Sequence, residues 1–130
     1  MFIRKLTTTD AFVAVDLGDV AGHGVVRCAA KILQGGAKDL ARSATYALAT
    51  LERHETGISA GINASPDDRD TAVAAFAAEV TGWDVGYRLT AAKGIETGSL
   101  GAVEQDDDAV LLAIGAVAAG LAACPNAGTA

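Results

Sequence analysis

Few residues of this chain stand at the spacings that a known chemistry requires. Gly22, His23 and Gly24 look like the start of a dinucleotide-binding turn, but the fingerprint G-x-G-x-x-G needs a third glycine where the chain has Arg27. No Gly-Lys-Ser/Thr triplet occurs either, so there is no P-loop. We therefore expect the chain alone to bind no NAD, NADP or other cofactor.

Two acidic features invite a metal but lack a full ligand set. His54 and Glu55 match the first half of the zinc-protease motif H-E-x-x-H, and Ile58 stands where the second histidine would be. The aspartates at 106–108 lack the spaced ligands of a calcium loop, and negative charge there suits the first turn of a helix. We interpret both as solvated surface and predict no metal site.

The two cysteines, Cys28 and Cys124, lie far apart and outside any C-x-x-C or Cys/His cluster. A cysteine nucleophile needs an adjacent base, and only His23 is near Cys28 in the sequence. Both are interpreted as reduced, buried thiols, which is typical of a cytoplasmic protein. No catalytic residue is predicted.

Strand and helix patterns alternate along the chain and must position these residues. Short β-branched or small-residue runs predict strands over residues 11–17, 24–30, 57–63 and 87–91. Three- and four-residue spacing predicts a helix over 37–51 whose buried stripe is Leu40, Ala44, Ala47, Leu48 and Leu51. A second helix, capped by Ser65 or Asp67 and ended by Gly82, buries Val73, Phe76, Ala77 and Val80. A third, over 108–124, is apolar on nearly every face, so we expect it to be buried, in part against a second subunit.

Composition and charge exclude several partners. Of the 130 residues, 51% are hydrophobic, which favours one compact domain over residues 1–130. A net charge of −6 without a basic, aromatic-rich window argues against nucleic acid and against an anionic membrane surface. The longest apolar segment is shorter than the roughly 20 residues that span a bilayer, and the N-terminus has no signal-peptide pattern. The chain is expected to be a cytoplasmic α/β domain, with a small mixed sheet and packed helices.

One segment carries a more specific resemblance. Leu40-Ala41-Arg42 and Thr45-Tyr46 match the pattern L-A-R-x-M-T-Y-K-N-A, and Gly57 and Gly61 match two glycines of a following G-G-G-K-G-G loop. Weaker matches stand at 24–27 (G-G-x-R), 65–70 (D-P-x-x) and 88–91 (Y-I-T-A). The chain thus resembles the glutamate/leucine/phenylalanine/valine dehydrogenase family, in the N-terminal domain that supplies substrate binding and subunit contacts.

The resemblance also shows which family groups this chain lacks. The family's substrate-carboxylate lysine falls at Ala47 and its catalytic lysine at Ser59, while its catalytic aspartate falls at Lys93 or Gly94. Alanine and an ordinary serine cannot replace lysines that work near neutral pH. Beside them, the family pattern places His23, Arg27 and Tyr46. The resemblance therefore implies a pocket for a small carboxylate lined by His23, Arg27, Tyr46, Ala47, Ser59 and Lys93, with the positions of Ala47 and Ser59 brought to one cleft.

The family's nucleotide-binding Rossmann domain is not among these 130 residues, so the resemblance implies NAD or NADP only if a partner domain exists. We expect a non-catalytic assembly or ligand-binding domain that forms a homo-oligomer or a heteromer with a Rossmann-domain chain. One alternative is part of an active oxidoreductase of altered substrate range, whose cofactor domain is supplied separately and whose rebuilt pocket uses Arg27, Tyr46, Ser59 and Lys93. Another is a structural domain without a ligand.

Overall fold

A five-stranded mixed sheet of order β1-β2-β4-β3-β5 runs through the centre of the molecule. The computed structural model describes residues 1–18, 20–83, 85–107 and 109–114. Its elements are β1 (Phe2–Lys5), β2 (Ala11–Val15), β3 (Gly22–Ala29), α1 (Gln34–Thr50), β4 (Thr56–Asn63), α2 (Arg69–Trp83), β5 (Tyr87–Ala91) and the 3₁₀ turn η1 (Gly101–Val103). Residues 109–114 are also helical. The predicted fold class, a small mixed α/β sheet with packed helices, is confirmed.

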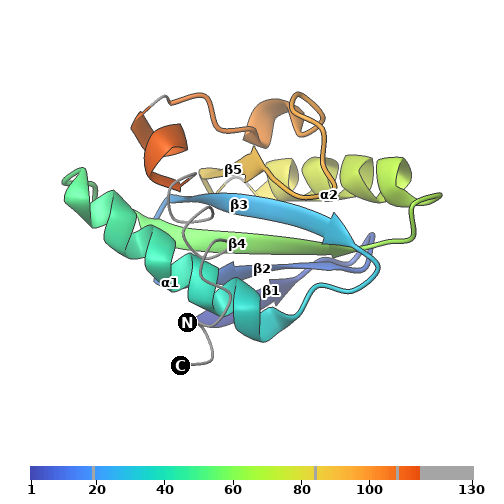
Figure 1. Cartoon of the computed structure of the whole chain (residues 1–130), viewed down its shortest axis with the longest axis horizontal. Coiled ribbons are helices and arrows are strands. Elements are labelled where there is room, and N and C mark those ends of the chain that lie inside the picture. The colour runs from blue at the N-terminus through green and yellow to red at the C-terminus, as the bar shows by residue number, and fades with distance from the viewer. Residues whose placement is uncertain (19, 84, 108, 115–130) are drawn as a thin grey trace.

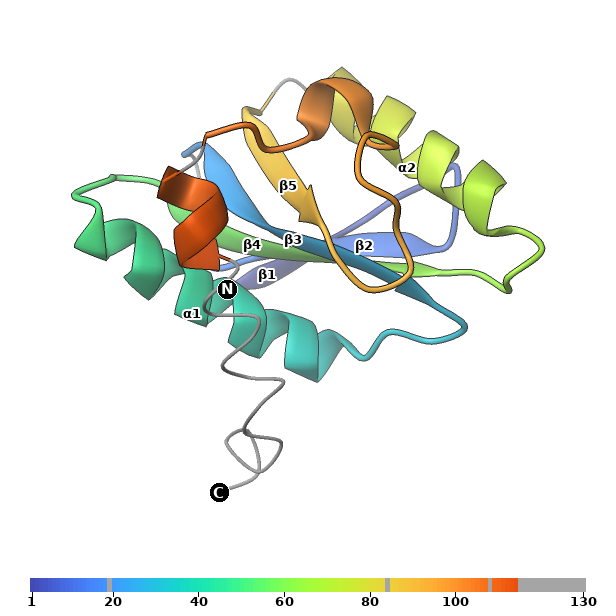
Figure 2. The same ribbon diagram turned by 45° about the horizontal axis from the view of Figure 1, so that its top comes forward.

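The two long helices lie on opposite faces of the sheet (Figures 1 and 2). Strands β4 and β5 run parallel to β3 on either side of it, whereas β1 and β2 form an antiparallel hairpin that pairs with β4. Crossovers between parallel strands are right-handed, so connections that step to β4 in one direction and to β5 in the other place α1 and α2 on different faces. The result is three layers, with α1 and residues 109–114 on one face and α2 on the other.

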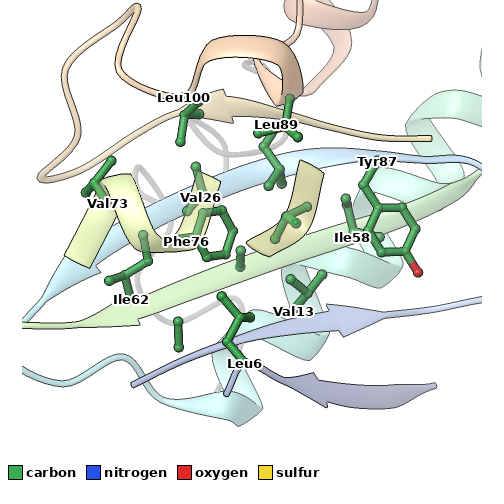
Figure 3. Packing of buried hydrophobic residues seen from close by; sticks show 14 of the residues in the cluster. Leu6, Val13, Val26, Ile58, Ile62, Val73, Phe76, Tyr87, Leu89 and Leu100 are labelled. Atoms are coloured by element: carbon green, nitrogen blue, oxygen red, sulfur yellow. The ribbon is translucent and has the colours of Figure 1, made fainter. Parts of the chain in front are cut away.

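The larger core lies between the sheet and α2. Alternate residues of the strands face this side, among them Val13, Val26, Ile58 and Leu89, and all four are fully buried. Phe76 of α2 reaches down among Val26, Ile62 and Val73 (Figure 3). The side chains between them point to the α1 face, which packs in two smaller clusters, one around Phe12 and Ile32 and the other around Val25 and Leu48.

Helix α1 packs more closely on the sheet than its predicted stripe implies. Its buried residues are Ala37, Ala41, Ala44 and Leu48, so the predicted members Leu40 and Ala47 lie on the flank and Leu51 is exposed. A Cβ added to Gly57 of β4 would lie 1.8 Å from the carbonyl oxygen of Ala41. The helix backbone therefore contacts the strand directly at this point, where Ala41 faces it, while Leu48 is buried two turns further along the helix.

Strand β1 is an element that the sequence pattern did not predict, because its four residues include Arg4 and Lys5. Helix α2, which covers the face of the sheet opposite α1, holds this strand and the turn after it in place. Glu79 of α2 accepts hydrogen bonds from the backbone N–H groups of Thr7 and Thr8 in the hairpin turn, at 3.0 and 2.9 Å. The Arg4 guanidinium lies 4.2 Å from the ring centre of Trp83 at the end of α2, a cation–π contact.

Helix α2 confirms the second predicted helix, with Val73, Phe76 and Val80 buried and Ala77 partly buried. Its predicted ends were wrong, because it begins at Arg69, beyond Ser65 and Asp67, and continues through Gly82 to Trp83. Cys28 is a buried free thiol, as expected, and burial raises its pKa. Most of the third predicted helix, including Cys124, lies outside the described residues. Among those described, the structure has no helix with the length and apolar character to cross a membrane.

Candidate functional site

The carboxyl ends of β3, β4 and β5 meet at one edge of the sheet, where the chain leaves β3 for α1 and leaves β4 for α2. Adjacent parallel strands whose connections diverge to opposite faces mark the point at which open α/β sheets bind ligands. Beyond β5 the pairing continues, because the Cys28 N–H donates to the Lys93 carbonyl at 2.9 Å. A ligand site at this edge would draw its side chains from β3, β4 and the segment after β5.

Three polar side chains on the α1 face, from the middle of the sheet toward this edge, have no hydrogen-bond partner among the described residues. They are Arg27 through Nε, Ser59 through Oγ and Thr90 through Oγ1, and each of these atoms is buried. The strand register makes them neighbours, since Val25 of β3 pairs with Ser59 on one side and with Thr90 on the other. Arg27 follows Val25 by two residues on the same face. We call Arg27, Ser59 and Thr90 the polar trio.

Orphaned buried polar groups are costly, so their grouping requires an explanation. A buried hydroxyl without a partner costs about 1–3 kcal/mol relative to an apolar replacement. Burial lowers the pKa of the Arg27 guanidinium, which nevertheless stays charged at neutral pH. No ion pair joins Arg27 to a carboxylate within the described part of the chain. One guanidinium and two hydroxyls form a donor set suited to a small anion.

A lid of apolar side chains covers the middle of the trio. Val25 packs in a cluster with Ala44 and Leu48 of α1 and with Val110 and Ile114. Figure 2 shows residues 109–114, in orange-red, beside α1 on the same face of the sheet. This apolar cluster therefore packs over Val25, which lies between Ser59 and Thr90 in the strand register.

The structure brings some of the predicted pocket residues together and separates others. Ser59, Arg27 and His23 share the α1 face, and Ala47 is partly buried on α1 itself. Thr45 and Gly57, which are twelve positions apart like Ala47 and Ser59, are in direct contact through a 2.7 Å hydrogen bond. Tyr46, by contrast, is 67% exposed on the outer side of α1. It does not lie with the polar trio.

Lys93 and His23 lie at different ends of the sheet. Lys93 is exposed just after β5, at the edge where the trio lies. His23 stands at the start of β3 and is buried, with its ring held between Glu55 and Gln105. Thr90 was not predicted as a site residue, although its strand match at 88–91 was recognised, because sequence alone does not tell which face of the sheet a strand residue occupies.

No group of three or more metal-ligating side chains is found among the described residues.

Comparison with known proteins gives one informative result. No family model matches the chain, and no curated protein matches its sequence. Among solved structures it is similar to L-tryptophan dehydrogenase from Nostoc punctiforme, with a TM-score of 0.58 and 16% sequence identity over 81% of this chain. The chain spans only 33% of that protein's length. The fold is therefore shared with part of an amino-acid dehydrogenase.

Proposed function

We propose that the chain is a domain that binds a small carboxylate through the polar trio and acts within a larger oxidoreductase-like assembly. The observation that carries this proposal is the cluster of unpartnered donors at Arg27, Ser59 and Thr90 on one sheet face. The fold likeness to an enzyme named for an α-amino acid supports a carboxylate as the anion. It also supports the relation to the amino-acid dehydrogenase family that the motifs imply.

The chain is proposed to be non-catalytic by itself. None of the trio is an acid or base that exchanges a proton readily near neutral pH, and the family's two lysine positions hold Ala47 and Ser59. NAD or NADP would have to come with a nucleotide-binding partner or domain. The alternative, an active oxidoreductase of altered substrate range, is favoured by one feature: Lys93 follows β5 at the same edge as Arg27 and offers an amine that a partner could bury.

The test is a titration followed by NMR, with a 2-oxo acid and an amino acid as probes. We expect a Kd on the order of 1 mM, with shifts confined to the neighbourhood of the trio. Arg27→Met should weaken binding at least about tenfold, because it removes the only charged donor of the trio. NADH is the negative control. Equal binding by wild type and Arg27→Met, or no saturable binding of any carboxylate, would contradict the proposal.

A matched pair of variants separates ligand binding from folding. Ser59→Ala should weaken carboxylate binding yet raise the free energy of unfolding by about 0.5–1 kcal/mol, because its hydroxyl has no described partner. Thr56→Val, on the same strand, should lower the free energy of unfolding by about 1–3 kcal/mol. The Thr56 hydroxyl accepts from the Leu17 N–H at 2.7 Å and donates to the Gly57 carbonyl at 3.0 Å. If Ser59→Ala instead destabilises the protein as Thr56→Val does, the hydroxyl is structural.

Assembly is the second part of the proposal. Leu112 is 77% exposed on the short helix whose Val110 and Ile114 are buried. We place the contact with a second subunit or a partner on this outer face of the helix, where Leu112 lies. We expect analytical ultracentrifugation to show a dimer or larger species at micromolar concentration, which Leu112→Lys weakens. A monomer of 13.0 kDa in both samples would contradict self-assembly and leave only a heteromeric partner.

A further inference from the structure

A buried histidine joins three segments at the end of the sheet where β3 begins, two residues before Val25 on the same strand face. His23 begins β3 and is 7% exposed. Its Nε2 lies against the carboxylate of Glu55, just before β4, and its Nδ1 lies against the side-chain nitrogen of Gln105. Gln105 is in turn fixed to β5, because its backbone N–H donates to the Leu89 carbonyl at 2.9 Å.

The partners of Gln105 decide where the imidazole proton is. The Gln105 Oε1 accepts the backbone N–H of Asp107 at 3.0 Å, so the amide NH₂ must face His23. Nδ1 then accepts a hydrogen bond, and the single proton of a neutral ring sits on Nε2 and is donated to Glu55. Every group in this arrangement is satisfied when His23 is neutral.

The two carboxylates of this cluster, Glu55 and Asp107, both have pKa values below their usual ones. Burial alone would raise the pKa of Glu55, but hydrogen bonds from His23 and Arg53 hold it below its usual value. The Val110 N–H and, more weakly, the Arg53 guanidinium hold the pKa of Asp107 below its usual value.

Arg53 bridges these two carboxylates, at 3.1 Å from Glu55 and in contact with Asp107. From β5, Arg88 is the register neighbour of His23, and its guanidinium donates to the Ala102 carbonyl at 2.6 Å. Of this cluster, the imidazole of His23 is the group that gains a second N–H donor when it binds a proton.

We propose that His23 is a pH-sensitive latch, which holds residues 105–107 and 109–114 against the sheet when neutral and loosens them when protonated. A second ring proton sits on Nδ1 and points at the NH₂ group of Gln105, donor against donor. If Gln105 rotates to present its oxygen, the Asp107 N–H loses its acceptor. The imidazolium keeps its contact with Glu55, so the unfavourable contact is the one between Nδ1 and the side chain of Gln105.

Loosening at Gln105 and Asp107 directly affects the short helix at 109–114. The Asp107 carboxylate accepts the N–H groups of Ala109 and Val110, at 3.1 and 3.3 Å, and so starts the helix at 109–114. That helix carries Val110 and Ile114 over Val25, between Ser59 and Thr90. Acidification would therefore open the polar trio. This last step rests on the proposed function, whereas the latch itself does not.

The test is hydrogen exchange on the full chain at pH 7.5 and 5.5, corrected for the intrinsic exchange rates. Protection of peptides within 105–114 should fall about tenfold relative to β4 peptides at the lower pH, the effect of losing one buried hydrogen bond. His23→Gln should abolish this pH dependence. His54→Gln is the matched control, because His54 is exposed and is the other histidine of the two. It should behave as wild type.

Gln105→Glu provides an independent check if His23→Gln fails to fold. A glutamate can accept from both the Asp107 N–H and a protonated Nδ1, so protection at pH 5.5 should be retained. The latch is overturned if wild-type protection does not change although imidazole NMR shows His23 protonated, or if His23 stays neutral until the protein unfolds. A pH dependence that persists in His23→Gln overturns it too. If exchange responds as expected but carboxylate titration fails, the latch stands and only the proposed ligand falls.

Discussion

Replacing Gly57 with alanine is expected to lower the free energy of unfolding by about 3–5 kcal/mol, a large part of the stability of a domain of this size. The new Cβ would lie 1.8 Å from the Ala41 carbonyl oxygen and 2.4 Å from the Thr45 nitrogen, both backbone atoms of α1. Neither can turn aside as a flexible side chain would. The helix must move away from β4 and break the 2.7 Å hydrogen bond between the Gly57 N–H and the Thr45 hydroxyl.

Urea unfolding followed by circular dichroism measures this effect, and Gly35→Ala is its matched control. Gly35 lies in the first turn of α1, where an added Cβ meets no atom within 4 Å. Because alanine is the better helix former, Gly35→Ala should raise the free energy of unfolding by about 0.5–1 kcal/mol. Equal effects at positions 35 and 57 would mean that the close contact between α1 and β4 does not exist in solution.

Truncating Phe76 to alanine should lower the free energy of unfolding by about 3–5 kcal/mol for a different reason. Phe76 is fully buried in the centre of the layer between α2 and the sheet, where Val26, Ile62 and Val73 surround it (Figure 3). Its removal leaves a cavity that the surrounding strands cannot fill without leaving their register. Leucine at position 76 fills part of that space and should cost less.

Tyr46→Ala is the control for aromatic truncation, because Tyr46 is 67% exposed on α1. Its effect should stay within about 0.5 kcal/mol. The same variant bears on the site. If Tyr46 belongs to the carboxylate pocket, as the family pattern implies, Tyr46→Ala would weaken ligand binding, whereas a ligand held by the polar trio alone is unaffected. The structure favours the second outcome.

The order of elements was predictable because most of the predicted strands and helices have a clear local signal, although the small-residue strand at 57–63 has a weak one. The runs at 11–17 and 24–30 are rich in valine, and they coincide with β2 and β3 within a few residues. Strand β1 has no such signal, since it is a four-residue edge strand with two basic side chains, held by contacts from Glu79 and Trp83 that come from far along the chain. On α1, Ala44 and Leu48 are buried as predicted. Leu40, Ala47 and Leu51 are not, because the close approach at Gly57 turns the side that carries Ala37 and Ala41 toward the sheet.

The site was only partly predictable, for a related reason. Arg27 and Ser59 were found through family motifs, whereas Thr90 becomes their neighbour only through the register across Val25. The partners of His23 were equally hidden, because Gln105 lies 82 positions along the chain and reaches it through a loop without hydrophobic periodicity. Local pattern says which residues are buried or paired within an element, but not which side chains from distant elements meet.

The cation–π contact between Arg4 and Trp83 also gives the protein an internal optical reporter. Trp83 is the single tryptophan of the chain, and it is partly buried where α2 ends against β1. Its fluorescence therefore reports whether the N-terminal hairpin is in contact with α2. It does not report the state of the α1 face. Emission from Trp83 and a signal from α1 follow two different layers of the same molecule, so their coincidence during unfolding would show that the layers separate together.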